Sequence, residues 1–175
     1  MSCVVGLIDN GRVWMGGDSQ AIDAVGYQDI DANPKVFHRG NLLLGAVGSI
    51  RLRQLLRYEE LPSLRVVEPG LSIEVLAEAI RQIAKENDLV TDGEIPGAAV
   101  MVGFAGHLAL IQTNFGVISP MCGYSATGTG GPVALGALSV LMHSNKSAEE
   151  RVRQALAASA QWQATVRPPF VIESL

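Results

Sequence analysis

The first twenty residues constrain the fold most, because they predict a β-hairpin at the start of the chain. Residues 2–8 are mostly apolar and rich in valine, and residues 12–17 form a second apolar run. Between them, Asp9-Asn10-Gly11 is a strong signal for a tight turn, since Asn and Gly tolerate positive φ angles. Gly16-Gly17 closes the second strand and indicates that another part of the molecule approaches the backbone there.

This hairpin would hold Ser2 in a fixed position at the chain end if Met1 is removed. A serine hydroxyl is a weak nucleophile that needs a base. A free α-amino group has a pKa of about 7.7–8.0, so its neutral fraction near neutral pH can serve as that base. Serine is small enough for methionine aminopeptidase to act on Met1. The alternative is that Ser2 is only the first residue of an edge strand.

No distant histidine is needed for such chemistry. The three histidines, His38, His107 and His143, lie in contexts that predict turns or helix ends.

The remaining pattern predicts two more hairpins, four helices and a closing strand. The hairpins join residues 34–37 to 42–47 and residues 98–104 to 108–111. The predicted helices begin at Ser49, at Ser72 as a cap, after the 128–132 loop, and at the capping box of residues 147–150. We expect residues 19–33 to be irregular, residues 117–126 to be extended, and residues 170–172 to form the last strand.

Strands gathered in runs, instead of alternating singly with helices, favour an α+β layered fold. At 175 residues the chain suits one domain, 1–175, that buries roughly 70% of its unfolded surface. An apolar content of 48% with 17% charged residues agrees with a well-packed core or a subunit with buried faces.

Composition also excludes several classes of function. The net charge of −4 gives no field that would attract nucleic acid, so we expect no nucleic-acid partner. Arg51, Arg53 and Arg57 are followed at once by two glutamates, which favours a solvated helix face. Cys3 and Cys122 lack metal-ligand spacing, so no zinc site or disulfide framework is expected, and no cofactor is predicted. Without a signal sequence or a run of about 18 apolar residues, we expect a cytoplasmic protein with no membrane partner.

Five short motifs fall in the order, and close to the spacing, seen in proteasome β-type subunits. They are Ser2-Cys3-Val4-Val5, the segment from Gly16 to Ala21, Lys35-Val36, Gly45-Ala46-Val47-Gly48 and the loop from Gly128 to Pro132. The chain most closely resembles bacterial peptidase subunits of the HslV type over nearly its whole length. The resemblance implies an N-terminal nucleophile hydrolase fold, a four-layer α-β-β-α sandwich of two antiparallel sheets flanked by helices.

The resemblance also implies a catalytic role for three residues. Ser2 would be the nucleophile, where the family commonly uses threonine. Lys35 would lie beside it, and its charge would stabilise the alkoxide, while Asp18 keeps the lysine charged. The alternatives are that Asp18 caps a turn and that Lys35 is a solvated strand end.

Three further positions follow from the same resemblance. Gly48 would donate its backbone N–H to an oxyanion, and Gly45 would border the substrate side-chain pocket. Thr129 would offer a hydroxyl to the amine or to water. A plain strand-to-helix turn is the alternative for Gly48. Gln161 falls where an ungapped alignment places an aspartate that helps orient the active-site hydroxyl, so a neutral amide replaces a charge.

These expectations describe a peptidase subunit that hydrolyses amide bonds through an acyl-enzyme on Ser2. By resemblance it assembles as a homo-oligomeric ring, acts on peptides or unfolded protein, and receives substrate from a separate ATPase unfoldase, because no motif in this chain binds nucleotide. Two alternatives remain: a catalytically silent ring subunit that keeps Met1, and a stand-alone amidase acting on a small amide.

Overall fold

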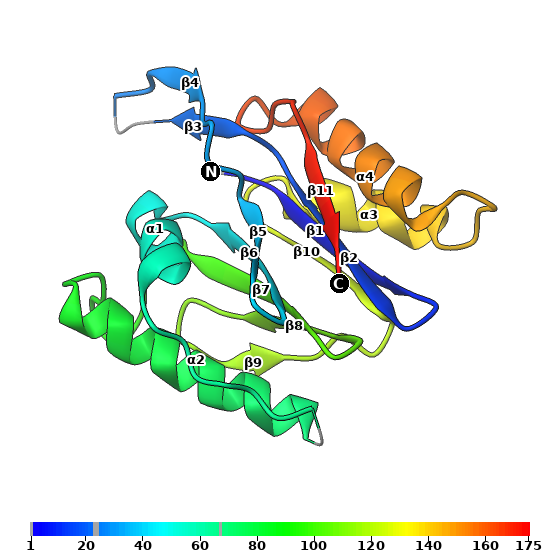
Figure 1. The fold of residues 1–175 in the computed structure, drawn as a ribbon. Coiled ribbons are helices and arrows are strands. Elements are labelled where there is room, and N and C mark those ends of the chain that lie inside the picture. The colour runs from blue at the N-terminus through cyan, green and yellow to red at the C-terminus, as the bar shows by residue number, and fades with distance from the viewer. Residues whose placement is uncertain (1, 23–24, 67) are drawn as a thin grey trace.

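The computed structural model describes residues 2–22, 25–66 and 68–175, which form four layers (Figure 1). Two antiparallel sheets pack face to face in the middle of the molecule. Helices α3 (Gly131–Leu141) and α4 (Ala148–Trp162) cover one outer face, and α1 (Ile50–Tyr58) and α2 (Pro69–Glu86) cover the other. The predicted α+β fold with an α-β-β-α arrangement is confirmed.

The first sheet contains the N-terminal hairpin. Its strand order is β10-β1-β2-β11, formed by β1 (Val4–Asp9), β2 (Arg12–Gly17), β10 (Tyr124–Thr127) and β11 (Val171–Ser174). The turn between β1 and β2 has φ angles of 49° at Asn10 and 76° at Gly11, as the sequence predicts. Because β1 lies between β10 and β2, the alternative that Ser2 begins an edge strand is wrong.

The second sheet has the order β5-β6-β7-β8-β9 and confirms both of the other predicted hairpins. Its strands are β5 (Val36–Arg39), β6 (Leu42–Val47), β7 (Ala99–Phe104), β8 (His107–Ile111) and β9 (Val117–Ile118).

The extended stretch predicted over residues 117–126 connects the two sheets. Its first part is β9 of the second sheet, and its last part is β10 of the first. The expectation that the histidines lie in turns or helix ends is wrong for His38, which lies within β5, and for His107, which is the first residue of β8.

The helices begin largely where the sequence predicts. Ser49 caps α1 by accepting the backbone N–H of Leu52, and the capping box from Ser147 to Glu150 opens α4. The predicted cap at Ser72 is wrong, since α2 begins at Pro69 and the Ser72 hydroxyl instead bonds to the backbone of Arg65. Proline at the first position of a helix loses no hydrogen bond, which explains the earlier start. Within the described residues, we find no helix with the length and apolar character needed to span a bilayer.

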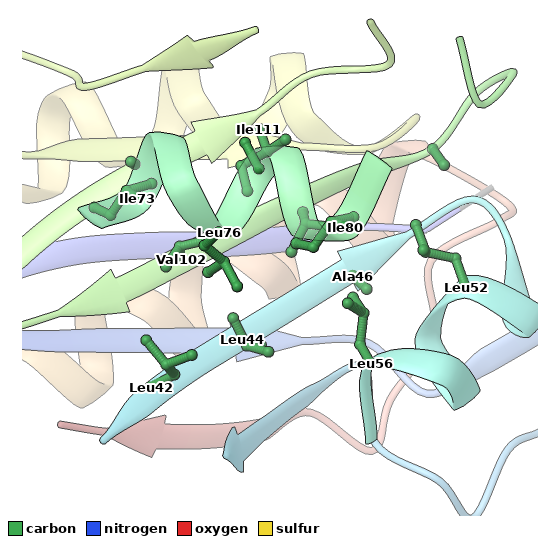
Figure 2. Packing of buried hydrophobic residues seen from close by; sticks show 14 of the residues in the cluster. Leu42, Leu44, Ala46, Leu52, Leu56, Ile73, Leu76, Ile80, Val102 and Ile111 are labelled. Carbon is green, nitrogen blue, oxygen red and sulfur yellow. The ribbon is translucent and has the colours of Figure 1, made fainter. Parts of the chain in front are cut away.

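Three apolar clusters fill the spaces between the layers. The largest lies between the second sheet and α2, where Ile73, Leu76 and Ile80 face Leu44 and Val102 (Figure 2). A second cluster lies between the two sheets and a third between the first sheet and the helices α3 and α4. Burial of apolar surface on both faces of each sheet therefore holds β1 and its N-terminal end in place.

The segment predicted to be irregular over residues 19–33 instead contains a small ribbon, so that expectation is wrong for its described part. β3 (Gln20–Ile22) pairs with β4 (Gln28–Ile30), and the side-chain amide of Gln20 donates to that of Gln28 at 2.9 Å. Residues 23–24 lie outside the described residues. β4 is exposed along its whole length, so it lacks the apolar alternation by which a strand is recognised in sequence.

Gly16 and Gly17 allow close packing on opposite faces of β2. A Cβ atom at Gly16 would lie 2.5 Å from Cγ1 of Val152 on α4, whereas one at Gly17 would lie 3.1 Å from Cβ of Lys35. The predicted close approach is confirmed on both faces.

We predict opposite stability effects for the same substitution at two glycines. Gly16→Ala should lower the free energy of unfolding by about 1–3 kcal/mol, because the added methyl overlaps Val152. Gly136→Ala, in α3 with no atom within 4 Å of the added methyl, should raise it by up to about 1 kcal/mol. Chemical denaturation of the two variants beside the wild type checks both signs. A Gly16→Ala variant as stable as the wild type would contradict the packing at Gly16, and a destabilised Gly136→Ala variant would contradict the open space at Gly136.

Candidate functional site

A buried ion pair joins Asp18 and Lys35 at the centre of the site. The Lys35 Nζ atom lies 2.8 Å from Oδ1 of Asp18, and the two side chains are 3% and 0% exposed. Nζ also donates to the carbonyl oxygen of Gln20 at 2.7 Å. The structure thus brings the two predicted residues together, and Lys35 is not a solvated strand end. The alternative for Asp18, an aspartate that caps a turn, also holds, because Oδ2 accepts a hydrogen bond from the N–H of Gln20.

Asp18 uses both carboxylate oxygens to hold surrounding backbone. Oδ1 accepts the N–H of Cys3 at 2.8 Å, and Oδ2 accepts the N–H of Gln20 at 3.0 Å. The N–H of Arg167 points at Oδ2 from 3.5 Å. The carboxylate therefore fixes the residue that follows Ser2.

Ser2 is buried and held by the loop that precedes α3. Its backbone nitrogen, which becomes the α-amine once Met1 is removed, donates to Oγ1 of Thr129 at 3.2 Å. Its carbonyl oxygen accepts the N–H of Gly130 at 3.1 Å. Thr129 thus lies where its hydroxyl contacts the nitrogen of Ser2, in agreement with the interaction expected from sequence.

The glycines of this loop are required by its contact with Ser2. Gly128 has a φ of 89°, and a Cβ atom there would lie 2.3 Å from the Ser2 carbonyl oxygen. A Cβ atom at Gly130 would lie 2.1 Å from Oγ of Ser159, which donates to the Gly130 carbonyl at 3.0 Å. A side chain at Gly128 would therefore push the loop away from Ser2, and one at Gly130 would push it away from Ser159.

A cavity of about 40 Å³ opens beside Ser2 and Lys35. It is lined by residues of the N-terminus, β3, β5–β6 and α1, namely Ser2, Gln20, Ala21, Ile22, Lys35, Ala46, Gly48, Ser49, Ile50 and Arg53. Gly45, expected to border the pocket, is not among them: a Cβ atom there would lie 2.5 Å from Sδ of Met15, between the two sheets. Ala46, the next residue, lines the cavity instead.

Gly48 lines the cavity, but a different contact explains why it is glycine. Its φ is 86°, and a Cβ atom would lie 2.3 Å from the carbonyl oxygen of Gly97. The glycine is thus required by the backbone conformation and by Gly97, not by the approach of a substrate. Its exposed backbone at the cavity wall remains suitable for hydrogen bonding to a ligand.

Burial changes the proton affinity of two groups at the site. It lowers the pKa of Lys35 below its ordinary value of 10.5, although the charge and hydrogen bond of Asp18 oppose this. Burial raises the pKa of the Cys3 thiol to about 12. Cys3 is therefore a protonated core side chain at neutral pH and is unsuited to act as a nucleophile.

The sequence reasoning was wrong about Arg53 and missed Asp31. Arg53 is 4% exposed and forms an ion pair with Asp31, so it does not belong to a solvated helix face. The signal available in the sequence was a charged residue on the buried stripe of α1, between Leu52 and Leu56.

Two hydroxyl residues near the glycine loop were also missed. Oγ1 of Thr165 lies 2.8 Å from Oγ1 of Thr129, and Ser159 is fully buried against Gly130. Gln161 is exposed on α4, and the residue after this helix whose hydroxyl contacts Thr129 is Thr165. In the part of the chain that the structure describes, no three His, Cys, Asp or Glu side chains are placed to hold a metal ion.

Comparison with known proteins identifies the fold. No protein-family model and no curated protein sequence matches this chain. Among solved structures, the Thiobacillus denitrificans protein BPH matches with a TM-score of 0.83 at 19% identity, over 99% of this chain and 97% of that one. The same protein in complex with epoxomicin matches equally well. Eukaryotic HslV from Trypanosoma brucei matches with a TM-score of 0.77 at 18% identity, over 99% and 98% of the two chains.

Proposed function

Because the chain has the fold of HslV-type peptidases, we propose that it is a peptidase that uses Ser2 as an N-terminal nucleophile after removal of Met1. One observation carries this proposal: Ser2 and Lys35 line one cavity, where the Ser2 nitrogen donates to the Thr129 hydroxyl and Lys35 is paired with the buried Asp18. Packing does not require a buried ion pair, since apolar residues of similar size are often as stable. Because Lys35 lines the same cavity as Ser2, whose nitrogen would become the α-amine, the presence of the Lys35–Asp18 ion pair there supports a chemical role.

The proposed reaction has two steps with one group as base. The Ser2 Oγ attacks the scissile carbonyl carbon while its proton passes to the neutral α-amine. The oxyanion accepts the N–H of Gly48, and the positive charge of Lys35 stabilises the developing negative charge. The α-ammonium then protonates the leaving amine, and the acyl group stays on Ser2 as an ester.

Water completes the cycle. The α-amine takes a proton from the attacking water, and the ester breaks to release the acid and restore the Ser2 hydroxyl. Thr129 accepts a hydrogen bond from the α-amine and so directs the nitrogen lone pair toward the Ser2 hydroxyl.

We expect Ser2→Ala to lower peptide hydrolysis by about a thousandfold or more, because it removes the nucleophile. Ser2→Thr should retain hydrolysis, since the hydroxyl and the amine are preserved. The matched control is Lys85→Ala, on an exposed position of α2. Turnover of a fluorogenic peptide by each purified variant checks this, with far-UV circular dichroism to confirm folding. Full activity of Ser2→Ala would refute the assignment of Ser2.

The rate should depend on pH through two groups. It should rise as the α-amine loses its proton, over a range near its ordinary pKa of about 7.7–8.0. It should fall again as Lys35 loses its charge, at a pH below the 10.5 of an ordinary lysine, because burial lowers that pKa. A profile of kcat/KM against pH measures both limbs. A rate that stays constant through the range of the α-amine would argue against the amine as base.

We propose that copies of this chain assemble into a ring that encloses the site. Helix α3 is apolar around most of its surface, yet part of that surface is exposed. The exposed fractions are 41% for Leu135 and 73% for Val140, and that of Trp162 at the end of α4 is also 73%. Such a helix is usually covered on all sides, which supports burial against another copy. Peptides or unfolded chains are the proposed substrates, and a separate ATPase unfoldase is the proposed partner that delivers them.

Val140→Glu should weaken this assembly, because it puts a charge into an apolar contact. We expect light scattering to give a mass several times that of one chain for the wild type, and a smaller mass for the variant. Lys85→Glu, at an exposed position of α2, serves as the control and should leave the mass unchanged. A wild type that is monomeric at all concentrations would contradict ring assembly and would favour a stand-alone amidase.

A further inference from the structure

The cavity beside Ser2 also indicates which substrate side chain it can bind, because Arg53 of α1 lines it. We propose that Arg53 makes this cavity a carboxylate-binding pocket, so that the peptidase prefers an acidic residue on the acyl side of the cleaved bond. This inference rests on the proposed function. Ser2 and Gly48 both line the cavity, so the residue whose carbonyl is attacked is the one that can place its side chain there.

Arg53 has hydrogen-bonding capacity left over. Its Nη2 atom pairs with Oδ2 of Asp31. Within the described residues, its Nε and Nη1 atoms donate no hydrogen bond. Neither of these two atoms is fully buried. These donors therefore remain in contact with the cavities that Arg53 lines. A guanidinium with free N–H groups in a fixed fork is suited to bind a carboxylate by two hydrogen bonds.

The charges around the cavity leave a cation to be neutralised. Among the described residues, Lys35 and Arg53 line it and no carboxylate does, and Arg57 lies in an adjoining cavity of about 260 Å³ that shares Arg53. Asp18 pairs with Lys35 and Asp31 pairs with Arg53, so Arg57 is the one of these three cations that has no carboxylate partner among the described residues. A substrate carboxylate would supply the missing negative charge.

The size and the polarity of the cavity also favour an acidic side chain. A volume of about 40 Å³ suits a compact polar group and is too small for an aromatic ring. Glutamine has nearly the shape of glutamate but cannot accept a bidentate pair from a guanidinium, so part of the buried donor group would be left unsatisfied. Hydrogen bonds to charged groups contribute about 1.5–3 kcal/mol, which corresponds to a preference of about 10- to 100-fold for the carboxylate.

Binding to the non-cleaving Ser2→Ala variant tests the pocket separately from the chemistry. The probes are two short N-acetyl peptide amides that differ only in a glutamate or a glutamine at the C-terminal residue. We expect the glutamate peptide to bind about 10- to 100-fold more tightly by calorimetry. Equal affinities would overturn the proposed pocket.

Additional substitutions in the Ser2→Ala background test whether Arg53 causes the difference in affinity between the two peptides. Arg53→Gln should bring the ratio of affinities close to one. Asp31→Asn should raise the ratio, because it removes the carboxylate that competes for Arg53 while preserving shape. Arg51→Gln is the matched control on the same helix, since Arg51 is exposed and donates to Asn87. If Asp31→Asn leaves the ratio of affinities unchanged or lowers it, the proposal is contradicted. This result can be measured even if Arg53→Gln does not fold.

Hydrolysis by the wild type separates the pocket hypothesis from the peptidase hypothesis. The substrates are two peptides that differ only in a glutamate or a glutamine before the cleaved bond. Preferential binding of the glutamate peptide without cleavage of either substrate would support the pocket and refute the peptidase. Cleavage after both residues at equal rates, with equal binding, would overturn the pocket and leave the peptidase in place.

Discussion

The buried ion pair of Asp18 with Lys35 is the interaction on which the rest of the site depends. Two charges placed 2.8 Å apart with almost no exposure are stable only if each is also hydrogen bonded. Asp18 meets this requirement by accepting backbone N–H groups of Cys3 and Gln20, and Lys35 by donating to the Gln20 carbonyl. The pair therefore couples the start of β1, the end of β2 and the start of β5, and it places Ser2 at their junction.

The second support for Ser2 is a set of neutral hydroxyls. Thr129 contacts both the Ser2 nitrogen and Thr165, while Ser159 secures the same loop through Gly130. In the described part of this network, Thr129 contacts the backbone of Ser2 and the hydroxyl of Thr165, and no carboxylate hydrogen bonds to it. In the mechanism proposed above, proton transfer falls to the Ser2 amine itself, with Lys35 acting through its charge.

Much of the fold could be predicted because its signals are local. The Asn10-Gly11 turn, the Ser49 and Ser147 caps and the apolar stripe of α2 each depend on a few neighbouring residues. The small ribbon of β3 and β4 could not be predicted, because its stability depends on contacts such as that of Asp31 with Arg53, 22 residues apart. The same limit explains why Arg53 was expected on a solvated helix face and why Ser159 and Thr165 were not expected near Ser2. Contacts between segments distant in sequence determine which polar side chains are buried.

The central claim is that Ser2 becomes the N-terminal nucleophile, and mass spectrometry of the chain treated with epoxomicin tests it most directly. That compound is the one held in the Thiobacillus denitrificans structure with the same fold. We expect Met1 to be absent and the peptide beginning at Ser2 to carry one molecule of the compound, whereas the Ser2→Ala variant should carry none. Complete retention of Met1 with no adduct on the wild type would contradict it.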